Sequence, residues 1–289
     1  MRLRVGAVLV GAAAIAAAGC GGGGGGSSTT SSSTGTMSDA AALLAAAPQK
    51  VEDATSSKVS FSITIDSDQL PNTLTIPGHG QFDYKTREGR MTLDYGDALS
   101  AAGQNGSGAM EILTKGDLVY LKSPLLSKAV GASTPWVSLD VTKLGQIAGV
   151  DTSSLQQVNE GDPAQTLVYL KAAGSVDEQG TEDVGGVSAT KYHAIIDVNR
   201  ISGLAPADQR AAVAASVKSL KQQYGIKKLP MDVWLDGQGL PRKLFYALST
   251  KEQGENVKTS LTMNLSDYGV DVNVQPPPAS QVTDLSSNS

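Results

Sequence analysis

The sequence is nearly free of cysteine and histidine. Cys20 is its one cysteine in 289 residues, so no disulfide can form within the chain. The two histidines, His79 and His193, lie far apart, and neither belongs to a metal-binding pattern such as His-Glu-x-x-His. We therefore expect no metal site, and we interpret both histidines as structural or surface residues.

Sequence motifs of catalysis and cofactor binding are also missing. There is no Gly-x-Ser-x-Gly nucleophile elbow, and we interpret Gly106-Ser107-Gly108 as a turn. The glycine run that follows Cys20 does not lie between a strand and a helix, as a phosphate loop would. We expect no catalytic residue and no cofactor, so the sequence does not favour an enzyme.

Positive charge is in deficit. The chain has 23 Lys and Arg against 28 Asp and Glu, a net charge of −5. Removal of residues 1–19, which contain Arg2 and Arg4 but no acid, would make it −7. A net negative charge argues against nucleic acid as a partner. It also argues against electrostatic docking on anionic lipid.

No apolar run is long enough to span a bilayer. The longest, residues 5–18, has about 14 residues, whereas a spanning helix needs roughly 20. With Arg2 and Arg4 before it and small residues after it, the run is typical of a secretory signal peptide. Ala17-Ala18-Gly19-Cys20 resembles the lipobox of bacterial lipoproteins, which implies lipidation of Cys20 and cleavage before it. Ordinary signal-peptidase cleavage, with Cys20 uninvolved, is the alternative.

Composition divides the remaining chain into three parts. Residues 20–38 are rich in Gly, Ser and Thr and are expected to form a flexible tether. Residues 39–275 are expected to form a single lipid-binding domain. Residues 276–289 begin with three prolines, and we expect a disordered tail there.

Period-two alternation predicts that this domain is rich in strands. Val59, Phe61, Ile63 and Ile65 alternate with polar residues, and residues 257–265 alternate in the same way. Similar runs, including a last one at 270–274, give about ten or eleven strands, many joined by short turns. Helices are expected near 39–56, with Pro48 marking a break or the start of a second turn, and near 140–173 and 206–224.

These elements predict an α+β fold: a strongly curved antiparallel β-sheet, a half-barrel, with helices covering its concave apolar face. Such a face can enclose an apolar cavity. The residues expected to line it are Phe61, Ile63, Leu93, Ile196, Val217, Leu220, Val233, Leu261 and Met263. Side chains could equally fill the space and leave a dry core. Trp136 and Trp234 are interpreted as core or rim residues rather than ligand contacts.

Several short patterns extend the resemblance beyond the lipobox. They are Gly116-Asp117-Leu118-Val119-Tyr120, Val184-Gly185-Gly186-Val187 before Lys191-Tyr192-His193, Val233-Trp234-Leu235-Asp236 before Leu240-Pro241-Arg242-Lys243, and Leu265-Ser266-Asp267-Tyr268-Gly269. With them the chain resembles the actinobacterial lipid-carrier lipoproteins of the LppX/LprG type, which are related in shape to LolA-like carriers. The resemblance implies a half-barrel that holds acylated lipids.

The function expected from these observations is that of a membrane-anchored lipoprotein. It would bind or carry a lipid or lipoglycan on the outer side of the cytoplasmic membrane, facing the periplasm or cell wall, with Cys20 as its anchor. A lipid exporter or transporter is an expected partner, and we expect a monomer. The alternative is a non-carrier envelope interaction protein, such as a sensor or an accessory subunit of a transporter or cell-wall enzyme.

Overall fold

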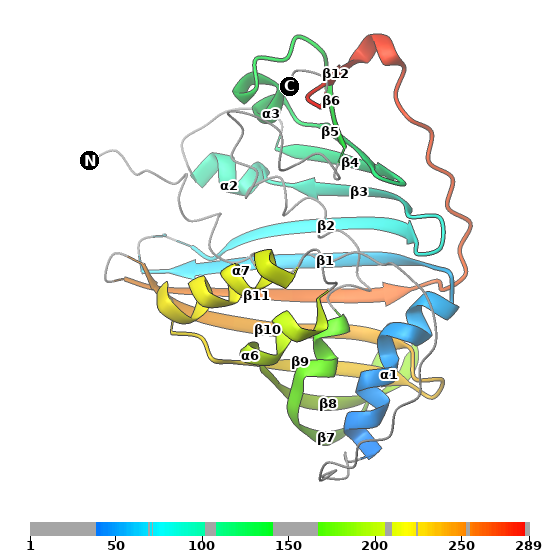
Figure 1. The fold of residues 1–289 in the computed structure, drawn as a ribbon, viewed down its shortest axis with the longest axis vertical. Helices are drawn as coiled ribbons and strands as arrows, with labels where there is room; N and C mark the ends of the chain where they lie inside the picture. Colours follow the sequence, from blue (N-terminus) through cyan, green and yellow to red (C-terminus); the bar gives the residue numbers. More distant parts are fainter. Residues whose placement is uncertain are drawn as a thin grey trace.

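One sheet organises the part of the chain that the structure describes. The computed structural model describes residues 39–68, 70, 72–101, 108–140, 167–205, 210–223, 225–252 and 255–286. The strands are β1 (Ser56–Ser67), β2 (Leu74–Asp83), β3 (Glu88–Asp94), β4 (Ala109–Lys115), β5 (Leu118–Lys122), β6 (Trp136–Asp140), β7 (Ala173–Val184), β8 (Val187–Asp197), β9 (Lys228–Asp236), β10 (Pro241–Glu252), β11 (Glu255–Ser266) and β12 (Val282–Asp284). They form a 12-stranded sheet in the order β12-β6-β5-β4-β3-β2-β1-β11-β10-β9-β8-β7, from top to bottom in Figure 1.

The sheet has an apolar face and a polar face because its strands alternate with a period of two. In β1, Phe61 and Ile63 lie directly opposite Met263 and Leu261 of β11, so all four share one face. Ser62, between them, lies on the other face. All neighbouring strands are antiparallel except β12 and β6, which are parallel.

Helices cover the apolar face over β7 to β11. They are α1 (Asp39–Asp53), α6 (Val198–Leu204), α7 (Arg210–Gln223) and the short 3₁₀ helix η4 (Tyr169–Ala172). The first three lie in front of the lower half of the sheet in Figure 1. The buried side chains of Leu44, Ile201, Leu220 and Leu170 bring all four helices into one hydrophobic core with β8, β9, β10, β11 and β1. We call these four helices the helix layer.

Two shorter helices accompany the other half of the sheet. They are α2 (Gly96–Ala101), which contacts β2, and α3 (Pro124–Ala129), which follows β5. Leu126 of α3 packs on a smaller apolar cluster that contains Ile112 and Leu121. The predicted α+β fold, a curved and mainly antiparallel sheet with helices over its apolar face, is confirmed.

The expectation of a disordered tail from residue 276 is wrong for the described part of that segment. Residues Ala279–Gln281 form a 3₁₀ turn, η5, and β12 pairs in parallel with β6. The Thr134 and Thr283 hydroxyls are 2.6 Å apart, and the Leu285 amide donates to the Ser138 carbonyl. The segment covers the β6 edge of the sheet, which would otherwise leave backbone groups unpaired.

Two local predictions are also wrong. Residues 270–274 form no strand; instead Val274 is buried against Leu113 and Trp136, and its carbonyl accepts a hydrogen bond from the Lys115 ammonium. Pro48 does not break the first helix, because α1 continues to Asp53 with Pro48 buried inside it. Of the helix predicted at 140–173, residues 141–166 lie outside the described residues.

Candidate functional site

The apolar face contains continuous rows of side chains that cross most of the sheet. Residues paired directly across neighbouring strands share a face, so the register defines these rows. One row crosses β8, β9, β10, β11, β1, β2, β3 and β4 through Tyr192, Val233, Leu244, Met263, Phe61, Gly78, Leu93 and Met110. The next row contains Ala194, Met231, Tyr246, Leu261, Ile63 and Ile76.

Glycines make room for aromatic rings in this face. The Phe61 ring lies over Gly78, and a Cβ atom added at Gly78 would overlap that ring. Phe82 lies over Gly89 of the neighbouring strand in the same way. A glycine inside a strand marks a bend or a close approach of this kind. These two glycines therefore let two large side chains lie against the backbone at the centre of the sheet.

The residues predicted to line a cavity lie on this face, except Val217 and Leu220, which lie on α7 above it, and they belong to different clusters. Seven of them join the large core beneath the helix layer: Phe61, Ile196, Val217, Leu220, Val233, Leu261 and Met263. Ile63 packs instead with Ile65 and Leu74, and Leu93 packs with Ile112 and Leu121. Their contact with a ligand remains a prediction.

Burial changes along the face. Ile196 and Val233, beneath the helix layer, are completely buried. Toward the centre of the sheet and beyond it, a group of apolar side chains stays half-buried; we call it the central strip. Its members are Phe61, Ile63, Met91, Leu93, Met110, Tyr246 and Leu261. The alternation within each strand predicts that these residues lie on an apolar face. Only the register between strands shows that Met91, Met110 and Tyr246 lie beside the residues predicted to line the cavity.

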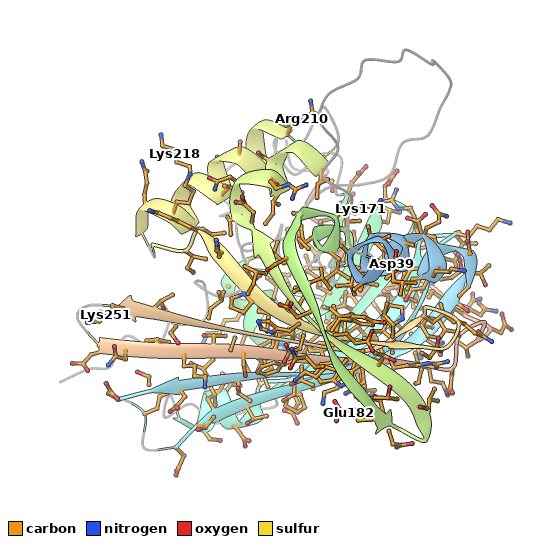
Figure 2. All side chains as sticks on the ribbon, turned by 90° about the horizontal axis from the view of Figure 1, so that it is seen from below. Asp39, Lys171, Glu182, Arg210, Lys218 and Lys251 are labelled. Atoms are coloured by element: carbon orange, nitrogen blue, oxygen red, sulfur yellow. The ribbon has the colours of Figure 1, made fainter. Side chains whose placement is uncertain are left out.

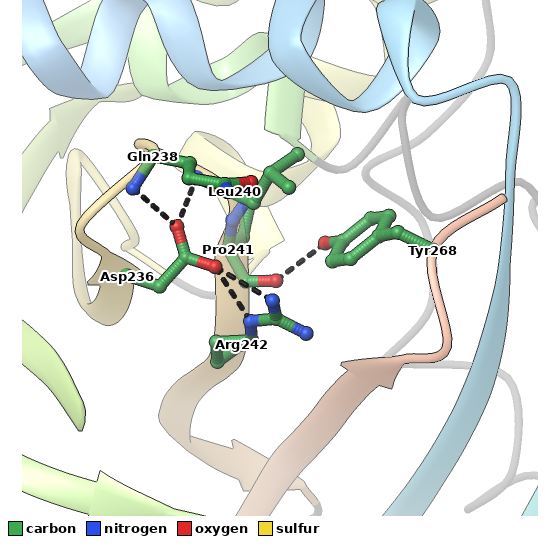
Figure 3. A network of polar contacts seen from close by, with 6 residues as sticks. All are labelled: Asp236, Gln238, Leu240, Pro241, Arg242 and Tyr268. Carbon is green, nitrogen blue, oxygen red and sulfur yellow. Dashed lines mark hydrogen bonds and ion pairs between the residues drawn. The ribbon is translucent and has the colours of Figure 1, made fainter. Parts of the chain in front are cut away.

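A polar network lies at the turn between β9 and β10 (Figure 3). The Asp236 carboxylate accepts hydrogen bonds from the amides of Gln238 and Leu240 and forms an ion pair with Arg242 at 2.7 Å. The Arg242 guanidinium lies over the ring of Tyr268, 5.0 Å from its centroid.

The Tyr268 hydroxyl completes this network. Burial raises its pKa well above the ordinary value, so it stays protonated and donates a hydrogen bond to the Pro241 carbonyl. The Asp236 carboxylate and the Tyr268 hydroxyl both bind other groups of the protein, so the network has a structural role.

Loss of Arg242 is expected to destabilise the fold. The Asp236 side chain is 5% exposed, so Arg242→Ala would leave a buried carboxylate without its cation. We expect the free energy of unfolding to fall by about 3 kcal/mol, measured by urea denaturation. Arg87→Ala is the control, because the pair of Arg87 with Asp117 is about half exposed and should cost less than about 1 kcal/mol. Equal losses for the two variants would contradict the structural role of the network.

The histidines and tryptophans do not join the apolar face. His193 binds the Asp232 carboxylate through Nδ1 at 2.6 Å on the opposite face of the sheet. Burial opposes ionisation of Asp232, but hydrogen bonds from His193 and Lys191 outweigh it and lower the pKa of this carboxyl. Trp234 is buried on the same polar face, between the ammonium groups of Lys191 and Lys243.

The described residues contain no cluster of three His, Cys, Asp or Glu side chains that could hold a metal ion. In the same part of the chain, every buried side-chain nitrogen or oxygen has a hydrogen-bond partner. None of the described helices has the length and apolar character needed to cross a bilayer. Cys20 and the tether predicted at 20–38 lie outside the described residues.

Comparison with known proteins gives one curated relative and several similar structures. No family model matches the sequence. An uncharacterized 31.2 kDa protein of Streptomyces griseus, from the rplA-rplJ intergenic region, is 29% identical over 210 residues, which cover 68% of this chain. The match spans 64% of that relative's own length.

Two of the similar structures are mycobacterial lipoproteins. LppX of Mycobacterium tuberculosis matches with a TM-score of 0.45 and 19% identity, covering 81% of this chain and 98% of LppX. LprF of Mycobacterium bovis matches with a TM-score of 0.44 and 15% identity, covering 83% of this chain and 97% of LprF.

Proposed function

We propose that the protein is a membrane-anchored lipoprotein that binds a lipid or lipoglycan by its acyl chains on the apolar face of the sheet. The observation that carries the proposal is the central strip. Its side chains belong to rows that are fully buried under the helix layer, yet these residues themselves stay half-buried. A ligand with acyl chains would complete their burial.

The expected energetics fit such a ligand. Burying one CH₂ group contributes roughly 0.8 kcal/mol, so ten methylenes contribute about 8 kcal/mol before the cost of ordering is subtracted. With a contribution of that size from the acyl chains, binding does not require a charged side chain that contacts the head group. The polar network at Arg242 is already satisfied, so acyl contact is the interaction that this face offers.

The location follows from the sequence rather than from the described residues. Lipidation of Cys20 would hold the protein at the outer side of the cytoplasmic membrane, with residues 20–38 as a tether. Residues 39–275 would form the lipid-binding domain, extended by the β12 segment at the sheet edge. A lipid exporter or transporter would supply or receive the lipid, and the protein would act as a monomer without catalysing a reaction.

Photo-crosslinking tests the binding face. A phospholipid with a diazirine in its acyl chain is incubated with the purified protein, irradiated, and the labelled peptides are mapped by mass spectrometry. We expect labels on the central strip, above all at Phe61, Leu93 and Leu261. Labels only on the polar face, for example at Ser62 or Thr262, or no labels at all, would contradict the proposal.

A further inference from the structure

Positive charge is concentrated on α6, α7 and the segment that leads to β9. Among the described residues from 198 to 228, six cations are exposed and no acid is present. The cations are Arg200, Arg210, Lys218, Lys221, Lys227 and Lys228. In sequence, Asp208 interrupts this stretch and Asp197 precedes it. A clear positive excess remains in a chain whose net charge is −5.

Neutral oxygen atoms are the hydrogen-bond partners of these cations within the described part of the chain. Arg200 donates to the Ala173 carbonyl at 3.1 Å, and Arg210 donates to the Ala205 carbonyl. The Lys221 ammonium donates to the side-chain oxygen of Asn199 at 2.6 Å. No ion pair of the described residues includes any of the six. Arg200 and Lys228 do interact electrostatically with the Asp197 carboxylate. The charge available to an external partner is therefore mainly that of Arg210, Lys218, Lys221 and Lys227.

The amphipathic character of α7 directs this charge outward. Val213, Val217 and Leu220 are buried in the core, which fixes the inner side of the helix. Figure 2 shows Arg210 and Lys218 pointing away from the sheet on the outer side of α7. The core covers the apolar side of α7, so its basic outer side is the part of the helix that an external partner can reach.

The β7 edge of the sheet carries a group of acidic residues. Asp177, Glu178, Glu182 and Asp183 are exposed on β7. Figure 2 shows Glu182 on the side opposite Arg210 and Lys218, whereas Asp39, the first described residue, lies on the same side as the helices. The described part of the chain therefore begins on the side of the sheet that the helices cover (Figure 2).

We propose that this basic surface, formed by α6, α7 and Lys227 and Lys228, docks the domain on anionic phospholipid head groups. The proposal goes beyond acyl-chain binding and rests on the membrane location proposed above. The negative net charge of the chain argued against such docking. However, at 0.1 M salt, screening limits the distance over which a surface charge acts to about 10 Å. The local excess near the bilayer therefore decides the attraction, and Glu182 of β7 lies on the opposite side of the molecule (Figure 2).

Vesicle co-sedimentation tests the docking without the anchor. The probe is a vesicle of phosphatidylcholine with 30% phosphatidylglycerol, and the protein is the whole mature chain, residues 20–289, with Cys20→Ser. The docking variant carries Arg210→Gln, Lys218→Gln and Lys221→Gln. The control variant carries Lys85→Gln, Lys251→Gln and Lys258→Gln, which removes three exposed cations from other parts of the surface.

We expect binding to the anionic vesicles and little binding to pure phosphatidylcholine. Each surface cation contributes about fivefold to the affinity, so the docking variant should bind on the order of a hundredfold more weakly. The control variant should change less than about threefold, and 0.5 M NaCl should abolish binding.

Equal losses in the two variants, absence of binding to the anionic vesicles, or equal binding to pure phosphatidylcholine would each overturn the proposal. Selective capture of an acidic protein with no vesicle binding would also overturn it. Lipid occupancy of the docking variant, measured by native mass spectrometry, separates the two proposals. Occupancy should stay at the level of the unmodified protein, because the substituted side chains are outside the apolar face.

Discussion

Cys20→Ala is expected to move the protein from the membrane fraction to the soluble fraction. Acyl chains add roughly 0.8 kcal/mol of membrane affinity for each buried CH₂ group, and stable anchoring needs more than one chain. Without the thiol there is nowhere to attach them. The described helices offer no membrane-spanning substitute. The change in distribution should be nearly complete when the membranes are washed with 0.5 M NaCl, which removes electrostatic binding, before fractionation and immunoblotting.

Intact-mass measurement makes this prediction specific. The unmodified protein should begin at Cys20 and carry additional acyl mass, and Ser27→Ala in the tether is the control that should change neither property. If Cys20→Ala loses residues 1–19 and still sediments with membranes that have been washed with 0.5 M NaCl, the anchor assignment is wrong. Ordinary signal-peptidase cleavage, the alternative, predicts no acyl mass on the unmodified protein.

Leu261→Trp is expected to reduce the bound lipid roughly tenfold while the protein remains folded. Leu261 is half-buried in the central strip, opposite Ile63 on one side and Tyr246 on the other. A larger side chain would occupy the volume proposed for an acyl chain. Excess volume in a packed site costs about 1–3 kcal/mol, and tenfold in affinity corresponds to about 1.4 kcal/mol.

Thr262→Trp is the matched control. Thr262 is the next residue of β11, and its partners Ser62 and Phe245 place it on the opposite face of the sheet. Lipid that co-purifies with each variant is extracted and quantified, and the unfolding temperature is measured alongside. Full lipid occupancy of Leu261→Trp, or equal losses in both variants, would count against a ligand on the apolar face.

Local alternation made most of the sheet predictable. In β1 and β11 apolar and polar side chains alternate along the strand, so the period of two is visible in the residues themselves. The same holds for the buried stripe of Val213, Val217 and Leu220 on α7. These signals need no knowledge of distant partners, which explains why the fold class was accessible from the sequence.

Elements fixed by distant partners were not predictable in this way. The sequence of β12 resembles a disordered tail, and only its pairing with β6 and the hydroxyl contact of Thr283 with Thr134 order it. The segment 270–274 is a similar case. Its residues alternate as in a strand, but the structure forms no strand there, and Val274 packs against Leu113 and Trp136 instead. Pro48 stays within α1 because the helix packs on the core around it.

The candidate site was predictable as a face, but not as a strip. Alternation identified Phe61, Leu93 and Leu261 separately, whereas their relation depends on register across four strands, β11 to β3. The basic surface was hidden for a related reason, because net charge averages over the whole chain. Both features require knowing which segments lie side by side.

Native mass spectrometry tests lipid binding most directly. The domain, residues 38–289, is exported in an actinobacterial host, purified without detergent, and measured intact. We expect an additional mass that extracts into organic solvent as an acylated lipid. Protein without added mass, unchanged after incubation with host lipid extract, would contradict lipid binding and favour a tethered interaction protein with a filled core.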